Sequence, residues 1–306
     1  MAFERTVDEG RERLKRSWSV MMATGAVGGI DVGLGVLALL LTQHLTHSTA
    51  LAALAFSAGF VALTLANSEL FTEDFLVPIA AVAAHKARAR QVVRLWGVTL
   101  VANFVGGWVI MGVVVAGLPD VRAHAVELGH HFAQIGYSGS SFATAVLGGA
   151  IITLMTWLER STESVPAKLL AAVVAGYLLA AGSLNHSVVL SLEMFAALHA
   201  GAPFGYVTWL GAMGWATLGN IIGGVGLVTV LRLVQVGSGK ISDERDRPHE
   251  ESREQTAEAH SGDSKSEPSG DSESSDPPGD SESKSSDESG DSESRSGVAQ
   301  ATKDPS

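Results

Sequence analysis

Two polar clusters interrupt long apolar stretches of this sequence, and both carry side chains suited to acid–base chemistry. The first, SELFTED at residues 68–74, holds Thr72 and three carboxylates; the second, LNHS at residues 184–187, holds Asn185 and His186. An imidazole with an ordinary pKa of about 6.5 can exchange a proton near neutral pH. A threonine hydroxyl can donate a hydrogen bond to an oxygen acceptor. This combination is suited to proton exchange and hydrogen bonding within an apolar region.

The acidic cluster restricts how its surroundings can fold. A charged side chain at the centre of a bilayer costs roughly 2.5–3.5 kcal/mol, so three carboxylates exclude an unbroken membrane span there. Irregular backbone at membrane depth persists only inside protein or beside a water-filled cavity. We therefore expect each polar cluster to join two half-helices. Glu69, Glu73 and Asp74 are expected to bond loop amides or to lie near the cytoplasmic vestibule.

The chain divides into two parts of unlike composition. It has no cysteine, which excludes disulfides, and a positive mean hydropathy of +0.23. Residues 241–306 hold 19 acidic and 7 basic side chains and no aromatic residue, a composition typical of disorder. We predict a cytoplasmic N-terminal segment at residues 1–18, a six-span membrane domain at 19–236 and a disordered acidic cytoplasmic tail at 237–306.

Six apolar stretches reach the length of a membrane span. They lie at residues 19–41, 49–84, 95–118, 143–158, 167–198 and 209–234. The second and fifth are too long for one span and contain the polar clusters. Basic residues concentrate in the N-terminal segment and in residues 86–94. The positive-inside rule then predicts a multi-pass plasma-membrane protein with both termini in the cytoplasm.

A short motif occurs twice in the membrane domain. Asn103 begins NFVGG in the third span, and Asn220 begins NIIGG in the sixth. Each motif follows a polar interruption at a similar distance, so the halves correspond. Three spans per half insert the two halves in opposite orientations, which is the inverted repeat of many transporters. We predict an all-α membrane protein built as a 3+3 inverted repeat, with the second and fifth helices broken.

The same residues resemble the formate/nitrite transporter family. SELFTEDF is similar to its broken second helix, LNHSVVLSLEMF to its broken fifth helix, and LGNIIGG to its sixth-helix signature. The resemblance implies a homopentamer in which each six-helix protomer has its own pore for small monovalent anions such as formate or nitrite. It also implies that Thr72 and His186 face each other at mid-pore, with Asn220 beside the histidine. We expect no enzymatic activity, cofactor or nucleic-acid partner.

The resemblance extends to the apolar constrictions of the pore and has clear departures. By position, the constrictions would be formed by Phe56, Phe60, Leu70 and Leu179. Glu73 and Asp74 stand where the family usually has small or amide residues, and Asn185 replaces the glutamate of formate channels. The Asn-Trp pair typical of the fourth helix is absent from residues 148–157. These departures indicate a divergent branch.

Two other classes of function remain open from the sequence. One is a non-conducting membrane scaffold or sensor with the same fold. The other is a rhomboid-like serine protease, because GYSG at residues 136–139 resembles its serine motif and His186 would be the base. Ser138 precedes the fourth span instead of lying inside it, which weighs against a protease.

A third polar feature is a histidine-rich segment after the third span. It contains His124, Glu127, His130 and His131, which are residue types that ligate metals. Their spacing matches no fixed metal scaffold. We expect a solvated outer loop and no metal site.

Overall fold

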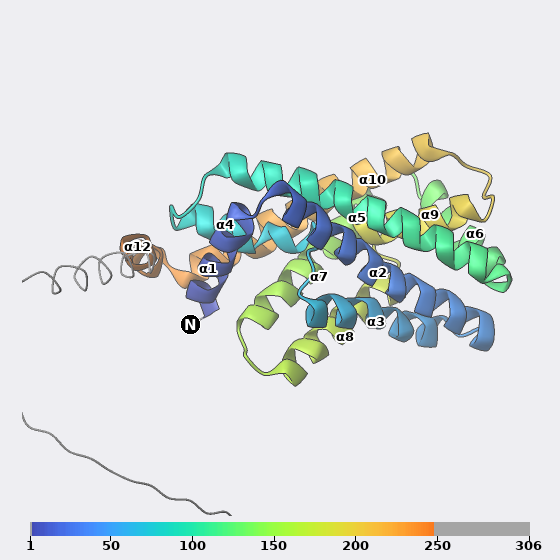
Figure 1. Cartoon of the computed structure of the whole chain (residues 1–306), viewed down its shortest axis with the longest axis horizontal. Coiled ribbons are helices and arrows are strands. Elements are labelled where there is room, and N and C mark those ends of the chain that lie inside the picture. Colours follow the sequence, from blue (N-terminus) through green and yellow to red (C-terminus); the bar gives the residue numbers. More distant parts are fainter. Residues whose placement is uncertain (1, 248–306) are drawn as a thin grey trace, which may run out of the picture. The chain divides into compact units, whose positions relative to one another are not determined.

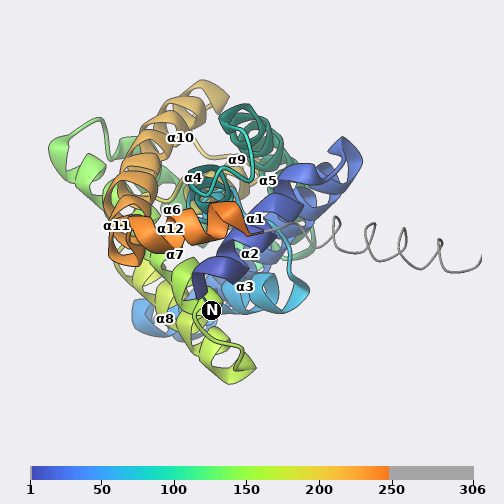
Figure 2. The same cartoon turned by 90° about the vertical axis from the view of Figure 1, so that its left-hand side faces the viewer.

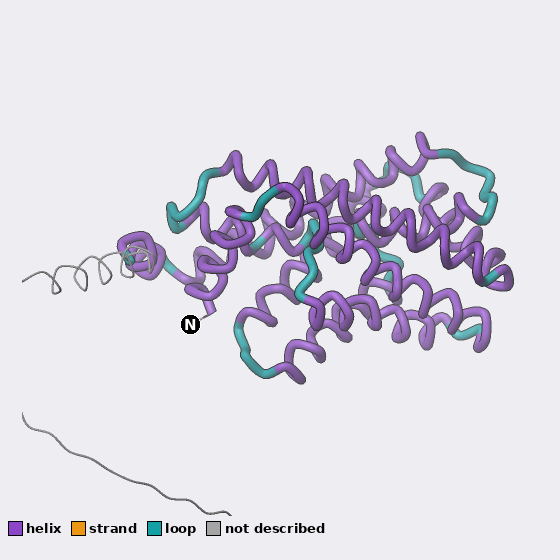
Figure 3. Tube along the Cα trace, in the orientation of Figure 1, coloured by secondary structure: helices purple, strands orange, loops and turns teal. Residues whose placement is uncertain are grey.

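The apolar stretches form long helices in the computed structural model, which describes residues 2–247 (Figure 1). All regular elements in that range are helical (Figure 3). Five helical segments have the length and hydropathy of a membrane span. They are Trp18–Thr46 (α2), Thr49–Ala66 (α3), Ala89–Gly117 (α5), Gly139–Arg160 (α7) and Tyr206–Val236, the last comprising α10 (Tyr206–Ile221), a π-helical turn (Ile222–Thr229) and α11 (Val230–Val236).

The second and fifth spans are broken, which confirms the expectation from their polar clusters. Helix α3 ends at Asn67, and the chain passes through a short 3-10 turn (η1, Glu73–Phe75) before α4 (Val77–Ala83). The fifth span consists of α8 (Val165–Ala181) and α9 (Ser187–His199). Asn67 and Ser183 adopt left-handed backbone conformations, with φ of 51° and 46°. That conformation ends a right-handed helix, so both breaks are encoded in the backbone.

Close packing between spans depends on glycines at equivalent places in the two halves. A side chain at Gly29 of α2 would collide with the carbonyl oxygen of Asn103 on α5, and one at Gly149 of α7 with that of Asn220 on α10. Glycine lets backbones approach closely where helices pack in membranes. The two halves of the protein therefore repeat the same helix contact.

Three helices outside the spans pack against the bundle. Helix α1 (Ala2–Lys15) buries Leu14 beside α4, and α6 (Arg122–Gln134) buries Phe132 beside α9. The sequence predicted a solvated loop where α6 lies. It forms a helix because Ala125, Gly129 and Phe132 give it one apolar face.

Helix α12 (Ser238–Asp246) lies where the sequence predicted disorder from residue 237 onward. Its Ile241 packs against an apolar cluster that includes Phe3 and Val7 of α1. Polar contacts add to this packing, because Lys86 Nζ donates to the carbonyl oxygens of Arg245 and Arg247 at the end of the helix. The remainder of the predicted tail lies outside the described residues.

The ends of the bundle differ in their charged residues. Helices α1, α4 and α12 lie at one end, and α6 lies toward the other (Figure 1). Viewed end-on, the long helices surround α4 (Figure 2). We call the first end the basic face, with Lys86, Arg88, Arg90, Arg160 and Lys168. We call the second end the histidine face, with His44, His47, His124, His130, His131 and His199.

Candidate functional site

The two broken helices meet through a pair of buried side chains. Thr72 lies just before η1, and His186 lies just before α9. Thr72 Oγ1 is 2.7 Å from His186 Nε2, and neither residue is exposed. The two side chains that the sequence singled out for chemistry therefore form one hydrogen bond between the two halves of the protein.

The hydrogen bonds around His186 assign its protonation state. The backbone N–H of Val189 donates to His186 Nδ1 at 3.3 Å, so the histidine caps the start of α9. A nitrogen that accepts an N–H carries no proton, and a neutral imidazole then carries its proton on the other nitrogen. Nε2–H therefore donates to Thr72 Oγ1. The Thr72 hydroxyl hydrogen remains for another acceptor, and an imidazolium would lose the Val189 bond.

Asn220 holds the backbone on both sides of His186. Its Nδ2 donates to the carbonyl oxygens of Ala145 at 2.7 Å and Asn185 at 2.8 Å, and its Oδ1 accepts from Ser187 N at 2.8 Å. All three bonds go to main-chain atoms. The broken helix frees these groups from helical bonding, and buried backbone groups need partners. Asn220 thus positions His186 indirectly, through its hydrogen bonds to the main chain on both sides of the histidine.

Asn103 makes the equivalent contacts in the first half. Its Nδ2 donates to the carbonyl oxygens of Gly25 at 2.7 Å and Glu69 at 2.9 Å, and its Oδ1 accepts from Phe71 N at 2.9 Å. Asn103 was not among the site residues predicted from the sequence. The repeated N-x-x-G-G motif was the signal for it, because the same amide then performs the same task in both halves.

Asn185 and the four predicted constriction residues are all buried. The Asn185 amide donates to Ser141 O at 2.7 Å, while its Oδ1 has no hydrogen-bond partner among the described residues. The apolar residues belong to one core cluster, in which the rings of Phe56 and Phe60 lie 5.7 Å apart. Leu70 and Leu179 complete the predicted set.

The three carboxylates of the first break converge on an arginine from α1. Arg13 lies 3.1 Å from Asp74, 3.7 Å from Glu69 and 3.8 Å from Glu73, and its side chain is 5% exposed. Glu9 of α1 adds a contact of 2.7 Å. Burial alone would lower the pKa of Arg13, but the four carboxylates hold it well above its ordinary value. The guanidinium therefore stays charged and compensates the loop.

Neighbouring groups extend this ion network. Arg16 lies 3.1 Å from Glu69, and Arg160 at the end of α7 pairs with Glu9. Asp31, whose role the sequence left open, accepts a hydrogen bond from Ser68. The role of Arg13 was missed because α1 reads as a polar surface helix. Nothing in its sequence marks one of its four basic residues as buried.

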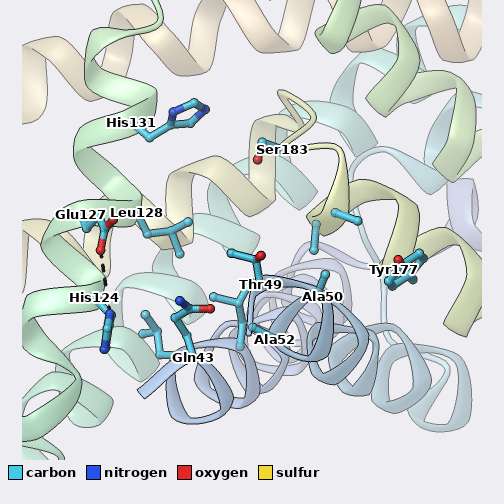
Figure 4. Close-up of a pocket in the computed structure, with 15 residues that line it drawn as sticks. Gln43, Thr49, Ala50, Ala52, His124, Glu127, Leu128, His131, Tyr177 and Ser183 are labelled. Atoms are coloured by element: carbon cyan, nitrogen blue, oxygen red, sulfur yellow. Dashed lines mark ion pairs between the residues drawn. The ribbon is translucent and has the colours of Figure 1, made fainter. Parts of the chain in front are cut away.

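Two cavities lie on either side of the apolar cluster. A cavity of about 220 Å³ on the basic face is lined in part by Arg13, Leu63 and Glu73. A larger cavity of about 650 Å³ opens on the histidine face and is lined in part by Ala52 and Ser183 (Figure 4). Thr72 and His186 line neither cavity and are both buried.

The remaining sequence candidates have local structural roles. Ser138 Oγ accepts from Ser141 N at 3.1 Å and caps α7, while both nitrogens of His186 are engaged by Thr72 and Val189. The described residues contain no group of three or more histidines or carboxylates placed to hold a metal ion.

Comparison with known proteins places this arrangement among membrane transporters. The inner membrane protein YfdC of Escherichia coli (strain K12) is 23% identical over 250 residues, covering 74% of this chain and 76% of that protein. The uncharacterized transporter YrhG of Bacillus subtilis (strain 168) is 23% identical over 241 residues, covering 74% of this chain and 89% of that protein.

Solved structures share the fold. An FNT family ion channel matches with a TM-score of 0.68 and 18% identity, covering 76% of this chain and 98% of that one. A pentameric formate channel with formate bound matches with a TM-score of 0.61 and 18% identity, covering 72% and 98%. The family profile of formate/nitrite transporters matches residues 1–234. The chain is therefore a multi-pass membrane protein that belongs to the formate/nitrite transporter family.

Proposed function

We propose that this protein conducts small monovalent weak-acid anions, such as formate or nitrite, through a pore in each protomer. The buried hydrogen bond between Thr72 and His186 carries this proposal. It joins the two half-helix breaks, and residues beside it in the chain, Phe71 and Val188, belong to the apolar cluster that includes Phe56 and Leu179. A site this apolar favours a neutral solute over a bare anion.

The hydrogen-bond directions suggest how an anion would be received. The Thr72 hydroxyl, fixed by the His186 Nε2–H, donates its own hydrogen to a substrate oxygen. Protonation of the anion requires His186 as imidazolium, formed when the Val189 N–H releases Nδ1. The neutral acid then passes the apolar constrictions of Phe56, Phe60, Leu70 and Leu179 more easily than its anion. Asn220 holds the backbone of the histidine in place, and the Asn185 amide oxygen offers an acceptor nearby.

The proposal includes the orientation of the protein in the membrane and its assembly. The basic face would be cytoplasmic by the positive-inside rule, with both termini in the cytoplasm of the plasma membrane. The solved relative described as a pentameric formate channel supports a homopentamer. The conducting domain comprises residues 19–236, with residues 1–18 as a cytoplasmic segment. The acidic tail lies outside the conduction mechanism.

The test is flux in proteoliposomes with formate, nitrite, acetate and hydrosulfide. We expect flux of at least one of these anions, and a marked decrease in the Thr72→Val variant, which keeps the shape but lacks the hydroxyl. Thr217→Val on α10 is the matched control, because the Thr217 hydroxyl contacts only a methionine sulfur among the contacts described. Folded protein without flux for any anion would favour the scaffold or sensor. Peptidase activity lost in Ser138→Ala would favour the protease.

A further inference from the structure

The cavity on the histidine face is unusual in its lining. Helix α6 contributes His124, Glu127 and His131, which lie along one side of the cavity opposite Tyr177 of α8 (Figure 4). Gln43 of α2 and Thr49 of α3 add neutral polar groups. The apolar floor, which includes Leu39, Leu40 and Ala180, belongs to or adjoins the core that contains the predicted constrictions.

Two more imidazoles gather beside this cavity. The ring of His44, on α2, lies 5.8 Å from that of His124, and the ring of His47 lies 6.3 Å from it. Glu127 is 3.9 Å from His124 but is 83% exposed. Four histidines therefore lie at one opening, on α2, on α6 and in the turn after α2.

Few permanently charged side chains lie near these four histidines. On the histidine face, the described residues include one arginine, Arg122, and two carboxylates, Asp120 and Glu127. Helix α9, which packs against α6, adds the buried carboxyl of Glu193. Helices α3 and α8 contribute no charged side chain to the cavity, and Tyr177 of α8 contributes a phenol. With all three carboxyls counted as ionised against one arginine, the net charge is −2 when the histidines are neutral. Protonation of His44, His47, His124 and His131 raises this net charge to +2, so proton uptake reverses the sign of the opening.

Proton and anion binding are then linked. Neighbouring imidazolium ions repel one another, and a small anion between them relieves that repulsion. By thermodynamic reciprocity, protons increase the affinity for the anion and the anion increases the affinity for protons. A low-dielectric cleft lined by one sign of charge also raises the local concentration of the opposite ion.

From this cavity and its charges, we infer that His44, His47, His124 and His131 form an anion-loading site at the outer opening, which binds a small monovalent weak-acid anion together with protons. The inference rests on the proposed conduction. The site delivers the substrate to the pore in acidic surroundings, before it meets Thr72 and His186. It is separate from the buried contact, because its imidazoles reach solvent.

The first experiment measures flux in proteoliposomes held at the same pH on both sides, so that protein orientation does not matter. Formate is the probe, with a chelator present. For the wild type we expect the KM to be about tenfold lower at pH 5.5 than at pH 7.5, as expected for electrostatic focusing. The variant His124→Asn/His131→Asn should lose most of this difference in KM. His130→Asn is the matched control, because His130 neighbours His131 but does not line the cavity.

The second experiment does not require conduction. Formate added to purified protein in weakly buffered detergent at pH 6 should cause proton uptake, measured with a pH electrode. The uptake should be smaller in His124→Asn/His131→Asn and unchanged in His130→Asn. Equal uptake in all three proteins would overturn the loading site. If the uptake follows this pattern while no protein conducts, the loading site stands and the proposed conduction fails.

Discussion

The two broken helices share a scaffold but differ in their chemistry. In the first break, Asn103 clamps the main chain around Leu70; in the second, Asn220 clamps it around His186. The first break carries three carboxylates that depend on Arg13 from α1, whereas the second carries no charge beyond what its histidine can acquire. The two halves therefore interrupt a helix in the same way, although the side chains at the two breaks differ.

The dependence of the first break on α1 predicts the largest effect. Arg13→Met should destabilise the protein by about 3–5 kcal/mol, because it leaves buried carboxylates uncompensated. Thermal unfolding in detergent, followed by tryptophan fluorescence, measures this change. Adding Asp74→Asn to Arg13→Met should recover part of the loss, since it removes one unpaired charge. The exposed Arg90→Met serves as the control. A wild-type melting temperature for Arg13→Met would show that α1 does not hold the loop.

The shared scaffold predicts two equal effects of intermediate size. Asn103→Ala and Asn220→Ala each remove three hydrogen bonds to buried main-chain groups, and each should lower stability by about 2–3 kcal/mol. The exposed Gln134→Ala should change little. If one substitution lowers stability and the other does not, the two breaks are not stabilised by equivalent asparagine hydrogen bonds.

The smallest effect concerns pH and the ion network of α1. Burial opposes ionisation of Glu9, but Arg13 and Arg160 together hold its pKa below the ordinary value of 4.5. A carboxyl whose pKa is lower in the folded state stabilises the fold above its unfolded pKa and loses this contribution as the pH falls through its folded pKa. The melting temperature should therefore fall below about pH 4.5, and less steeply in Glu9→Gln. Parallel curves of melting temperature against pH for both proteins would show that Glu9 does not contribute to the pH dependence of stability.

Much of the scaffold followed from the sequence. Six apolar stretches, two polar interruptions and the repeated N-x-x-G-G motif predicted the broken spans, because membrane burial strongly limits where polar residues can lie. The contact between Thr72 and His186 was anticipated through the family resemblance. The role of Arg13 was not anticipated, because the sequence of a polar helix does not show which partners its charged residues contact. Helix α12 was missed for a similar reason, since one isoleucine in a polar segment gives almost no pattern.

The central claim is that His186 supplies a proton to the passing anion, and flux against pH tests it most directly. Proteoliposomes with wild type and His186→Asn would be compared for formate and for nitrate, which remains an anion throughout the range. We predict that wild-type formate flux rises as the pH falls from about 8 to about 5.5, because a larger fraction of His186 is protonated at lower pH. In His186→Asn, formate flux at acidic pH should fall, while nitrate leak persists or rises. Identical pH profiles for both proteins would contradict the claim.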